Sequence, residues 1–592
     1  MASGWVKSIS RVLLGVWLGS MAGNAQAYFG WGVNHILERE WWVYESRHFR
    51  FISDAEPNVV SRQIHDMELF RTYVRATMGF ATELQGETAR RDPVLRRARD
   101  AQPVAEEDRI DVYMLSRRTY LVRLFNSPET YGFMRPGLRK SVMVIAPEQD
   151  SDLPNSVAFH EYVHFLLRAV GGSHFPPWYE EGLAEFFAAT RFSRERGGEA
   201  QGPGEVIVGE VPSRRLQSLY DRQRFPVDNI FRAGSPFLLE AGHGSVLGAA
   251  AKDGAESRAE RRVRRRLAGI PTNPIFYAQS WSLIHMLLLG HHAGLPRRDH
   301  LLADYVLDIQ QGREPEAALQ HHFAGLSEDL ERDLRRYIRR KSAIPRVAIP
   351  MSQFDYDPRF KRRPLELTEL ADRLGRLVAP VSPDVARKLY TRALAEAPDS
   401  APVLAGMGVT QRLSGRMSKA LELVERSLEQ APEDPRVNFD FADTVSLICR
   451  SSRYVSERTA DVAVRSSCPQ LLPRAMQSYA RALEFMPDNT EFKAYYGVAL
   501  LQSGEAERAS VLLREAFDGA PWSPGVSFAL GESLRRLGRF EEAMPYLQRA
   551  SVWFFKSPVL QIRAKSALEL ARLNISDVPD GSRSNRQFDT LN

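Results

Sequence analysis

The feature that most restricts the fold is a repeat of 34 residues in the last third of the chain. This interval separates matching glycine, alanine and proline residues: Gly497 and Gly531, Ala509 and Ala543, Pro398 and Pro432, Pro487 and Pro521. A fixed period of this length is typical of helix–turn–helix units that stack into a solenoid. Each unit buries its apolar face against the next, so this stretch is expected to fold only as a stack.

One repeat carries an insertion that contains both cysteines of the chain. Gly408 and Gly497 are 89 residues apart, which is two periods plus 21 residues. The additional 21 residues fall near 449–468, where Cys449 and Cys468 lie. In an oxidising compartment these two residues could form a disulfide. Closing such a loop would stabilise the fold by about 3 kcal/mol if chain entropy dominates.

Glycine, alanine and proline at these positions of a 34-residue unit resemble the tetratricopeptide repeat. We count about five units from 367 to 557 and then a capping helix to about 575, so residues 367–575 form an all-α solenoid. The resemblance implies a concave groove that binds a protein partner, and the alternative is a spacer without a ligand. Prolines mark residues 346–366 as a linker, and the polar tail 576–592 is expected to be disordered.

A motif of a different kind, H-E-x-x-H, is formed by His160, Glu161 and His164. Helix-start and helix-end residues flank it, namely Asn155 or Ser156 before it and Gly171-Gly172 after it. Residues four apart share one helix face, so both imidazoles can bind a single metal ion. Glu161 lies beside the metal and can take a proton from a water molecule that the metal activates.

A second helix is predicted over Trp178–Ala188, with Pro177 in its first turn. We expect Glu181 to be the third protein ligand of a zinc ion, with the fourth position left for water as in catalytic sites. Glu180 is the competing ligand, but it lies about 100° round the helix from Glu181. Glu185 shares the face of Glu181 and would hold the N–H of a zinc-bound histidine.

These two segments resemble the gluzincin metallopeptidases, in which H-E-x-x-H precedes a helix bearing E-x-x-A, here Glu181-Gly182-Leu183-Ala184. The small Gly182 and Ala184 would let the two helices approach closely. The pattern looks most like exported bacterial peptidases of the MA-like type that carry helical repeats. Sixteen residues separate His164 from Glu181 and no G-x-M-E-N motif precedes the helix, so aminopeptidase activity is not implied. The expected fold is an α+β gluzincin domain (28–190) with a helical continuation (191–345), followed by the all-α solenoid.

The resemblance also suggests where a peptide substrate would lie. Strands are predicted at 41–52, 110–115 and 138–146, and a helix at 59–78. In gluzincins the strand before the active helix is a sheet edge to which the substrate adds. The residues expected to bind the substrate backbone are therefore Ser141, Val142, Met143 and Val144. A helix over 276–289 offers Tyr277, with His285 as second choice, to stabilise the oxyanion, although either could be a core residue.

Residues 1–27 have the pattern of a secretory signal peptide. A basic start is followed by an apolar run too short to span a bilayer and by Ala25-Gln26-Ala27. Cleavage there would leave a periplasmic or secreted bacterial protein with no stable membrane span. The net charge of +6, from 79 basic and 73 acidic residues, does not indicate nucleic-acid binding.

The sequence therefore predicts an exported zinc metallopeptidase that cleaves a peptide or protein, with repeats that recruit a substrate or partner. The alternative is a catalytically inactive periplasmic scaffold, in which the repeats bind partners and the peptidase domain is a relic.

Overall fold

The computed structural model describes fourteen stretches of the 592-residue chain. They are residues 35–78, 109–126, 131–135, 137–138, 141–147, 155–169, 175–193, 204–221, 224–233, 274–310, 313–340, 343–451, 466–553 and 558–576. The predicted signal peptide and almost all of the predicted tail lie outside these residues. Within them, no helix combines the length and the apolar character needed to cross a bilayer.

A six-stranded sheet forms the centre of the first half of the molecule, with strand order β4-β5-β3-β2-β1-β9. Its strands are β1 (Trp42–Glu45), β2 (Phe49–Ser53), β3 (Ile110–Met114), β4 (Gly132–Arg135), β5 (Val142–Ile145) and β9 (Lys361–Pro364). The inner pairs β2–β3 and β3–β5 are parallel, whereas β4 and β9 are antiparallel edge strands. The single strand predicted over 41–52 is wrong, because the chain reverses near Ser46 and makes the antiparallel pair β1–β2.

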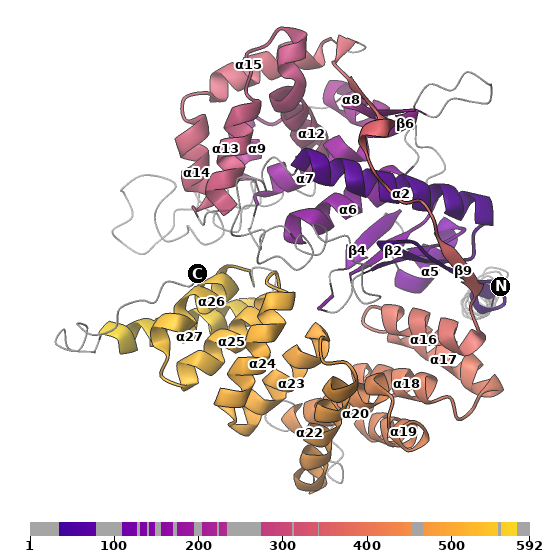
Figure 1. The fold of residues 1–592 in the computed structure, drawn as a ribbon. Helices are drawn as coiled ribbons and strands as arrows, with labels where there is room; N and C mark the ends of the chain where they lie inside the picture. Colours follow the sequence, from indigo (N-terminus) through magenta and orange to yellow (C-terminus); the bar gives the residue numbers. More distant parts are fainter. Residues whose placement is uncertain are drawn as a thin grey trace, which may run out of the picture.

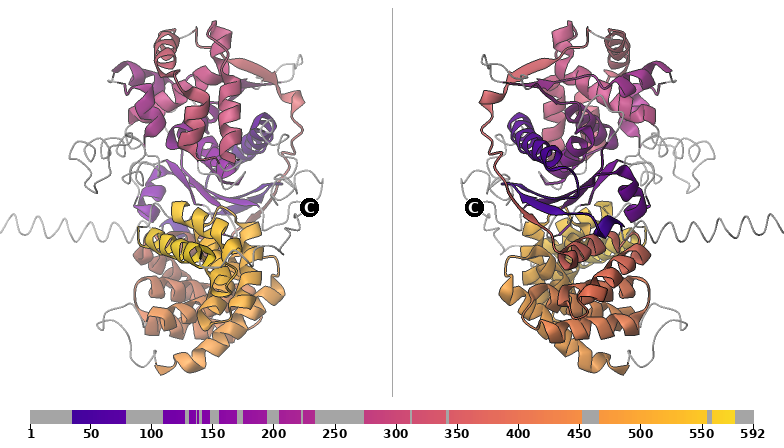
Figure 2. Two further views of the ribbon diagram at one scale, coloured as in Figure 1. Left: turned by 90° about the vertical axis from the view of Figure 1, so that its left-hand side faces the viewer. Right: turned by 90° about the vertical axis from the view of Figure 1, so that its right-hand side faces the viewer.

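Both faces of this sheet are covered, as Figure 2 shows. Phe51, Val112 and Met143 point into the larger core, which they share with α2 (Pro57–Met78), α6 (Ser156–Ala169) and α7 (Pro177–Ala188). The alternate residues Ile52, Tyr113 and Val144 point to the other face. There they meet three helices: α5 (Arg118–Phe125), α16 (Leu367–Val378) and α17 (Pro383–Glu396). The first repeat is therefore a structural layer of the sheet domain, which is why the inner strands are apolar on both faces.

The region between the sheet and the repeats is mainly helical. Its helices are α8 (Ser213–Asp221), α9 (Val227–Arg232), α12 (Pro274–Leu289), α13 (Asp299–Gln310), α14 (Pro315–Phe323) and α15 (Ser327–Ile338). A second sheet joins β6 (Arg191–Ser193), β7 (Glu205–Val208) and β8 (Val347–Pro350). The helical continuation expected over 191–345 thus also contains the strands β6 and β7.

The segment predicted as a linker, 346–366, belongs to both sheets. Its strand β8 pairs with β7, and its strand β9 pairs with β1 over four residues. In Figure 1 the chain passes from α15 alongside α2 to β9 before it enters the repeats. The prolines that suggested a linker lie at or near the ends of these edge strands, where a missing N–H is tolerated.

The predicted tetratricopeptide-type solenoid is confirmed as five antiparallel pairs of described helices with a final helix, beginning with α16 and α17. The others are α18 (Ala401–Leu413), α19 (Met417–Gln430), α20 (Pro435–Ser451), α22 (Cys468–Phe485), α23 (Thr490–Ser503), α24 (Ala506–Gly519), α25 (Pro524–Arg536), α26 (Phe540–Trp553) and α27 (Pro558–Ser576). The repeated glycine has a packing reason. A Cβ on Gly497 or Gly531 would lie 2.7 Å from Cγ of Leu513 or Leu547 on the second helix of the pair.

The predicted Cys449–Cys468 disulfide is confirmed, with 5.7 Å between the two Cα atoms. It joins the end of α20 to the start of α22, across the insertion. We expect the C449S/C468S variant to lose about 3 kcal/mol of unfolding free energy under oxidising conditions, because its unfolded chain is no longer constrained. Urea unfolding monitored by circular dichroism checks this. A reductant should lower the stability of the wild type to that of the variant, and equal stability without reductant would contradict the prediction.

Candidate metal centre

Two histidines and one glutamate converge where α6 passes α7. His160 Nε2 and His164 Nε2 are 3.1 Å apart. Glu181 Oε2 lies 3.4 Å from each of these nitrogens. The three atoms thus form a nearly equilateral triangle built from two helices, as the H-E-x-x-H and E-x-x-A motifs predict. Glu180, the competing ligand, is not part of this cluster.

This triangle has the dimensions of a tetrahedral zinc site. Ligand atoms at about 2.0–2.1 Å from a zinc ion in tetrahedral geometry lie about 3.3–3.4 Å from one another. Glu181 Oε2 is buried and receives no hydrogen bond from the described residues, because its contacts with the imidazoles exceed normal hydrogen-bond length. Two imidazole nitrogens and one carboxylate oxygen are one of the donor sets of catalytic zinc sites. The residues present therefore fit a zinc ion.

The charges of the cluster are strongly coupled. Burial disfavours the imidazolium form of His160, but the contact with Glu181 and the charge of Glu185 outweigh burial and raise its pKa to about 9. Burial by itself would raise the pKa of the Glu181 carboxyl. The polar contacts with His160 and His164 outweigh burial and hold this pKa well below its usual range. A cation is thus favoured at this point, whether it is a proton or a metal ion.

Local packing fixes the two helices that carry the ligands. Asn155 adopts a left-handed conformation with φ of 75° immediately before α6, and its carbonyl oxygen accepts a hydrogen bond from Phe159 N. The Phe159 ring stacks on Phe70 of α2 at a centroid distance of 3.9 Å. On α7, a Cβ at Gly182 would lie 2.6 Å from Ser280 O. Gly182 therefore permits the close approach of α7 to α12, and not to α6 as the sequence suggested.

Glu161 points from α6 toward the edge strand β4. Its Oε2 accepts a hydrogen bond of 2.9 Å from the backbone N–H of Met134. Tyr131 O accepts a hydrogen bond from Ala146 N, so the odd-numbered residues of β4 form its backbone hydrogen bonds with β5. The amide of the even-numbered Met134 therefore points away from β5. Among the described residues, Oε2 is the only oxygen of Glu161 with a polar contact. Oε1 therefore has no competing donor among them.

The sheet edge next to the site is β4, a strand that was not predicted from the sequence. The four residues expected to bind substrate, Ser141, Val142, Met143 and Val144, lie at or inside β5. The assignment of these residues to the edge is wrong, because β5 is bonded to β3 on one side and to β4 on the other. The aromatic residues Tyr131 and Phe133, followed in the sequence by Pro136-Gly137, could have indicated β4.

Glu185 lies behind His160, as predicted, and has a partner that the sequence did not indicate. Its Oε1 is 3.5 Å from His160 Nδ1. Arg215 on α8 holds the same carboxylate with two hydrogen bonds, from Nε at 2.9 Å and from Nη2 at 2.5 Å. A pairing across 30 residues has no local signal in the sequence. Arg215 also lies over the Tyr277 ring, with 5.2 Å between its Cζ and the ring centroid.

The two candidates for oxyanion stabilisation occupy different environments. Tyr277 is half-buried; burial and the charge of Glu181 raise the pKa of its hydroxyl to about 12, although Arg215 opposes this. Tyr277 therefore lies near the cluster and keeps its proton at neutral pH. His285 is fully buried, and its two ring nitrogens contact Tyr337 Oη and Gly209 O at 2.8 and 2.9 Å. His285 is thus a core residue.

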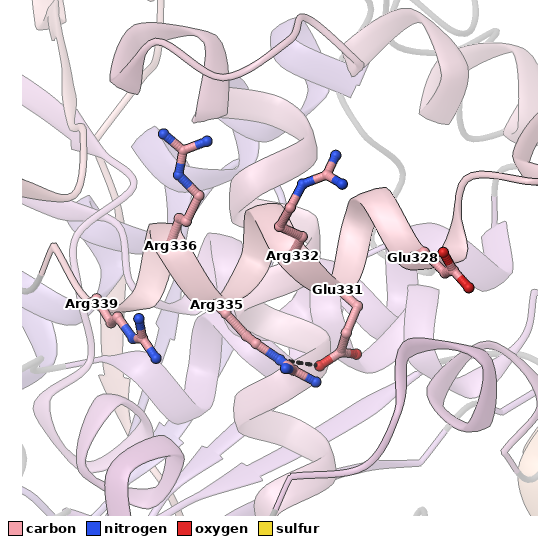
Figure 3. A pocket seen from close by; sticks show the side chains of 6 residues that line it. All are labelled: Glu328, Glu331, Arg332, Arg335, Arg336 and Arg339. Atoms are coloured by element: carbon pink, nitrogen blue, oxygen red, sulfur yellow. Dashed lines mark hydrogen bonds and ion pairs between the residues drawn. The ribbon is translucent and has the colours of Figure 1, made fainter.

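Two other polar features do not form ligand sites. Asp308, His321 and His322 could together hold a cation, but Asp308 Oδ2 is already bonded to His322 and lies 3.2 Å from Arg313 Nε, which opposes a metal. A hollow along α15 is lined by side chains of that helix and of Arg339, which directly follows it (Figure 3): Glu328, Glu331, Arg332, Arg335, Arg336 and Arg339. Because Glu331 accepts a hydrogen bond from Arg335, part of this charge is neutralised and the hollow is a solvated helix face.

Comparisons with known proteins recognise the repeats. The tetratricopeptide-repeat family model matches residues 382–438 and 500–566. A thermophilic TPR protein of Thermus thermophilus, TTC0263, is similar at 24% identity, with 34% of this chain and 99% of that chain covered and a TM-score of 0.28.

Two further solved structures are similar to the same part of the chain. MamA from AMB-1 shows 19% identity and a TM-score of 0.25, with 32% of this chain and 98% of that chain covered. YrrB, described as a TPR protein with an unusual peptide-binding site, shows 17% identity and a TM-score of 0.25, with 34% of this chain and 92% of that chain covered. No curated protein matches the chain. The C-terminal region of this protein contains tetratricopeptide repeats.

Proposed function

We propose that this protein is an exported, periplasmic or secreted zinc metallopeptidase of the gluzincin type. The observation that carries the proposal is the triangle of His160, His164 and Glu181, whose 3.1–3.4 Å edges match tetrahedral zinc coordination. No name among the matches reported above is that of a peptidase, so the proposal depends on these residues and not on relatives.

The residues around the cluster supply the groups that peptide hydrolysis requires. A zinc ion bound here would act as a Lewis acid and lower the pKa of a water molecule. Glu161 takes a proton from the attacking water and delivers it to the leaving amine, for which its Oε1 is available. The protonated hydroxyl of Tyr277 donates to the oxyanion that forms on the substrate carbonyl.

The substrate that suits this site is an extended peptide. The strand β4, whose Met134 N–H holds Glu161, is a sheet edge, and an edge strand can bind an additional strand through its remaining main-chain groups. The tetratricopeptide repeats add a surface for a protein partner.

Metal analysis combined with a cleavage assay tests the proposal. The purified protein should contain one zinc ion per chain and produce new termini in a peptide library, and removal of zinc by a chelator should stop cleavage until zinc is restored. Bound zinc without any cleavage would favour the rival function, which is a scaffold with a relic site. The match to the tetratricopeptide-repeat family model supports this rival. Absence of zinc binding would refute the metal centre.

Arg215 is expected to position the site by holding Glu185. Lysine cannot form the two parallel hydrogen bonds, so Arg215→Lys should weaken zinc binding by about tenfold or more, as loss of such supporting contacts commonly does. Zinc affinity measured with a competing chelator, together with the pH profile of kcat, checks this. Arg214→Lys is the matched control, because Arg214 is exposed on the same helix. Equal zinc affinity of the two variants would rule out the positioning role.

A further inference from the structure

Among the described residues, two separate contacts between the repeats and the sheet domain involve the hairpin formed by β4 and β5. Leu138, between these strands, packs against a cluster of Ala494, Ala516 and Val526. These three residues belong to α23, α24 and α25, in the fourth and fifth helix pairs. Figure 1 shows β4 on the side of the sheet that is turned to these helices.

The second contact lies at the first helix pair. Arg135 Nη1 donates a hydrogen bond of 2.8 Å to Leu377 O near the end of α16. Phe133 and Val142 pack against the core that the sheet shares with α16 and α17. The β4–β5 hairpin therefore bridges repeats that are more than 100 residues apart in the sequence.

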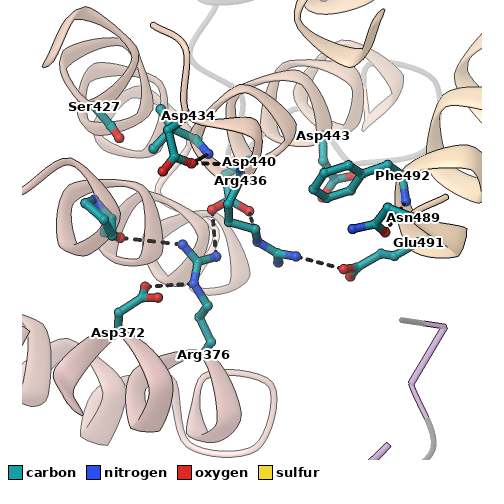
Figure 4. A network of polar contacts seen from close by, with 12 residues as sticks. Asp372, Arg376, Ser427, Asp434, Arg436, Asp440, Asp443, Asn489, Glu491 and Phe492 are labelled. Carbon is teal, nitrogen blue, oxygen red and sulfur yellow. Dashed lines mark hydrogen bonds and ion pairs between the residues drawn. The ribbon is translucent and has the colours of Figure 1, made fainter. Parts of the chain in front are cut away.

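The charged groups between these two contacts are already neutralised by one another (Figure 4). Arg376 pairs with Asp440 at 2.6 Å, and Arg436 pairs with Glu491 at 2.7 Å. Arg412 and Asp443 form a third, largely buried pair. Breaking such pairs is costly because it leaves a buried charge without its partner. Arg376, Arg412 and Arg436 are therefore already paired with acidic residues of the repeats, whereas the cluster that Leu138 contacts is apolar.

The hairpin is connected to the metal centre through Glu161. Its strand β4 carries Met134, whose N–H holds Glu161 Oε2. The hairpin is closely packed at Gly132, because a Cβ there would lie 2.6 Å from Val157 Cγ1 of α6 and 2.8 Å from Val144 O of β5. A displacement of the hairpin from the repeats therefore moves the amide that positions Glu161.

We propose that the cluster of Ala494, Ala516 and Val526 is an internal docking site for Leu138, and that its occupancy sets the position of β4 beside Glu161. Through this contact the repeats regulate the site. This inference rests on the proposed function for its biological meaning, but the contact itself can be tested without any cleavage assay.

The test is a double-mutant cycle on the full-length, zinc-loaded protein with Leu138→Ala and Val526→Ala. Each variant should speed amide hydrogen exchange of β4, including Met134, by about tenfold, because each removes apolar contact from the docked hairpin. The double variant should exchange no faster than either single variant, since both remove the same interaction. Val511→Ala is the control, as Val511 is 56% exposed on α24.

The outcomes distinguish this inference from the proposed function. Unchanged exchange of β4 in both single variants, or additive effects in the double variant, would overturn the docking site even if the protein is an active peptidase. Faster, non-additive exchange supports it even if no cleavage is found. Leu138 is partly exposed, so its replacement by alanine leaves the folded core intact, and zinc content and circular dichroism verify this.

Discussion

Glu161→Gln is expected to keep its zinc and to lose at least about 10³-fold in kcat, within the range of general acid–base catalysis. Glutamine has nearly the same shape, and its amide oxygen can still accept the hydrogen bond from Met134 N. It cannot take up a proton at neutral pH, so the attacking water keeps both of its protons. Because Glu161 is not among the three residues proposed to bind zinc, the coordination should be unaffected.

Zinc content and kcat measured on the same preparation check this expectation. Glu180→Gln is the matched control, since it removes a carboxylate one residue before Glu181 that is not part of the metal cluster. The control should retain both zinc and turnover. Wild-type turnover in Glu161→Gln would refute the role of Glu161 as the base, and loss of zinc would show that Glu161 binds the metal.

Glu181→Ala is expected to abolish stoichiometric zinc binding and, with it, all metal-dependent hydrolysis. Only two imidazoles would remain, whereas zinc sites in enzymes use three protein ligands. The change can also be followed without metal. Since contact with Glu181 is among the causes that raise the pKa of His160 to about 9, its removal should lower that pKa. NMR titration of the imidazole signals in the metal-free protein measures it.

The raised pKa of His160 also predicts how the stability of the metal-free protein depends on pH. The pKa of His160 is higher in the folded protein than in the unfolded chain, so its protonation stabilises the fold fully below about pH 6.5 and this stabilisation is lost as the pH rises through about 9. In Glu181→Ala this dependence should be weaker. Urea unfolding of both forms between pH 6 and 10 tests it, and identical pH profiles would contradict the coupling of Glu181 to His160.

The sequence by itself determined the features that arise from short, regular spacing. An interval of four residues on a helix brings His160 and His164 to one face, and this requires no knowledge of the rest of the chain. The 34-residue interval similarly predicted the helix pairs, and Gly408, Gly497 and Gly531 each pack against the second helix of their own pair. For Cys449 and Cys468 the sequence offered a disulfide as a possibility, and the structure shows that it forms.

Only the tertiary structure decided which distant segments meet. The sheet edge beside Glu161 is β4 and not β5, because β5 also pairs with β3, and pairing partners cannot be identified from the composition of one strand. Arg215 reaches Glu185 across 30 residues, and Arg135 reaches Leu377 across 242. Such contacts depend on how whole layers pack. The physical reason is that backbone periodicity fixes which side chains share a face, whereas burial of those faces selects their partners from anywhere in the chain.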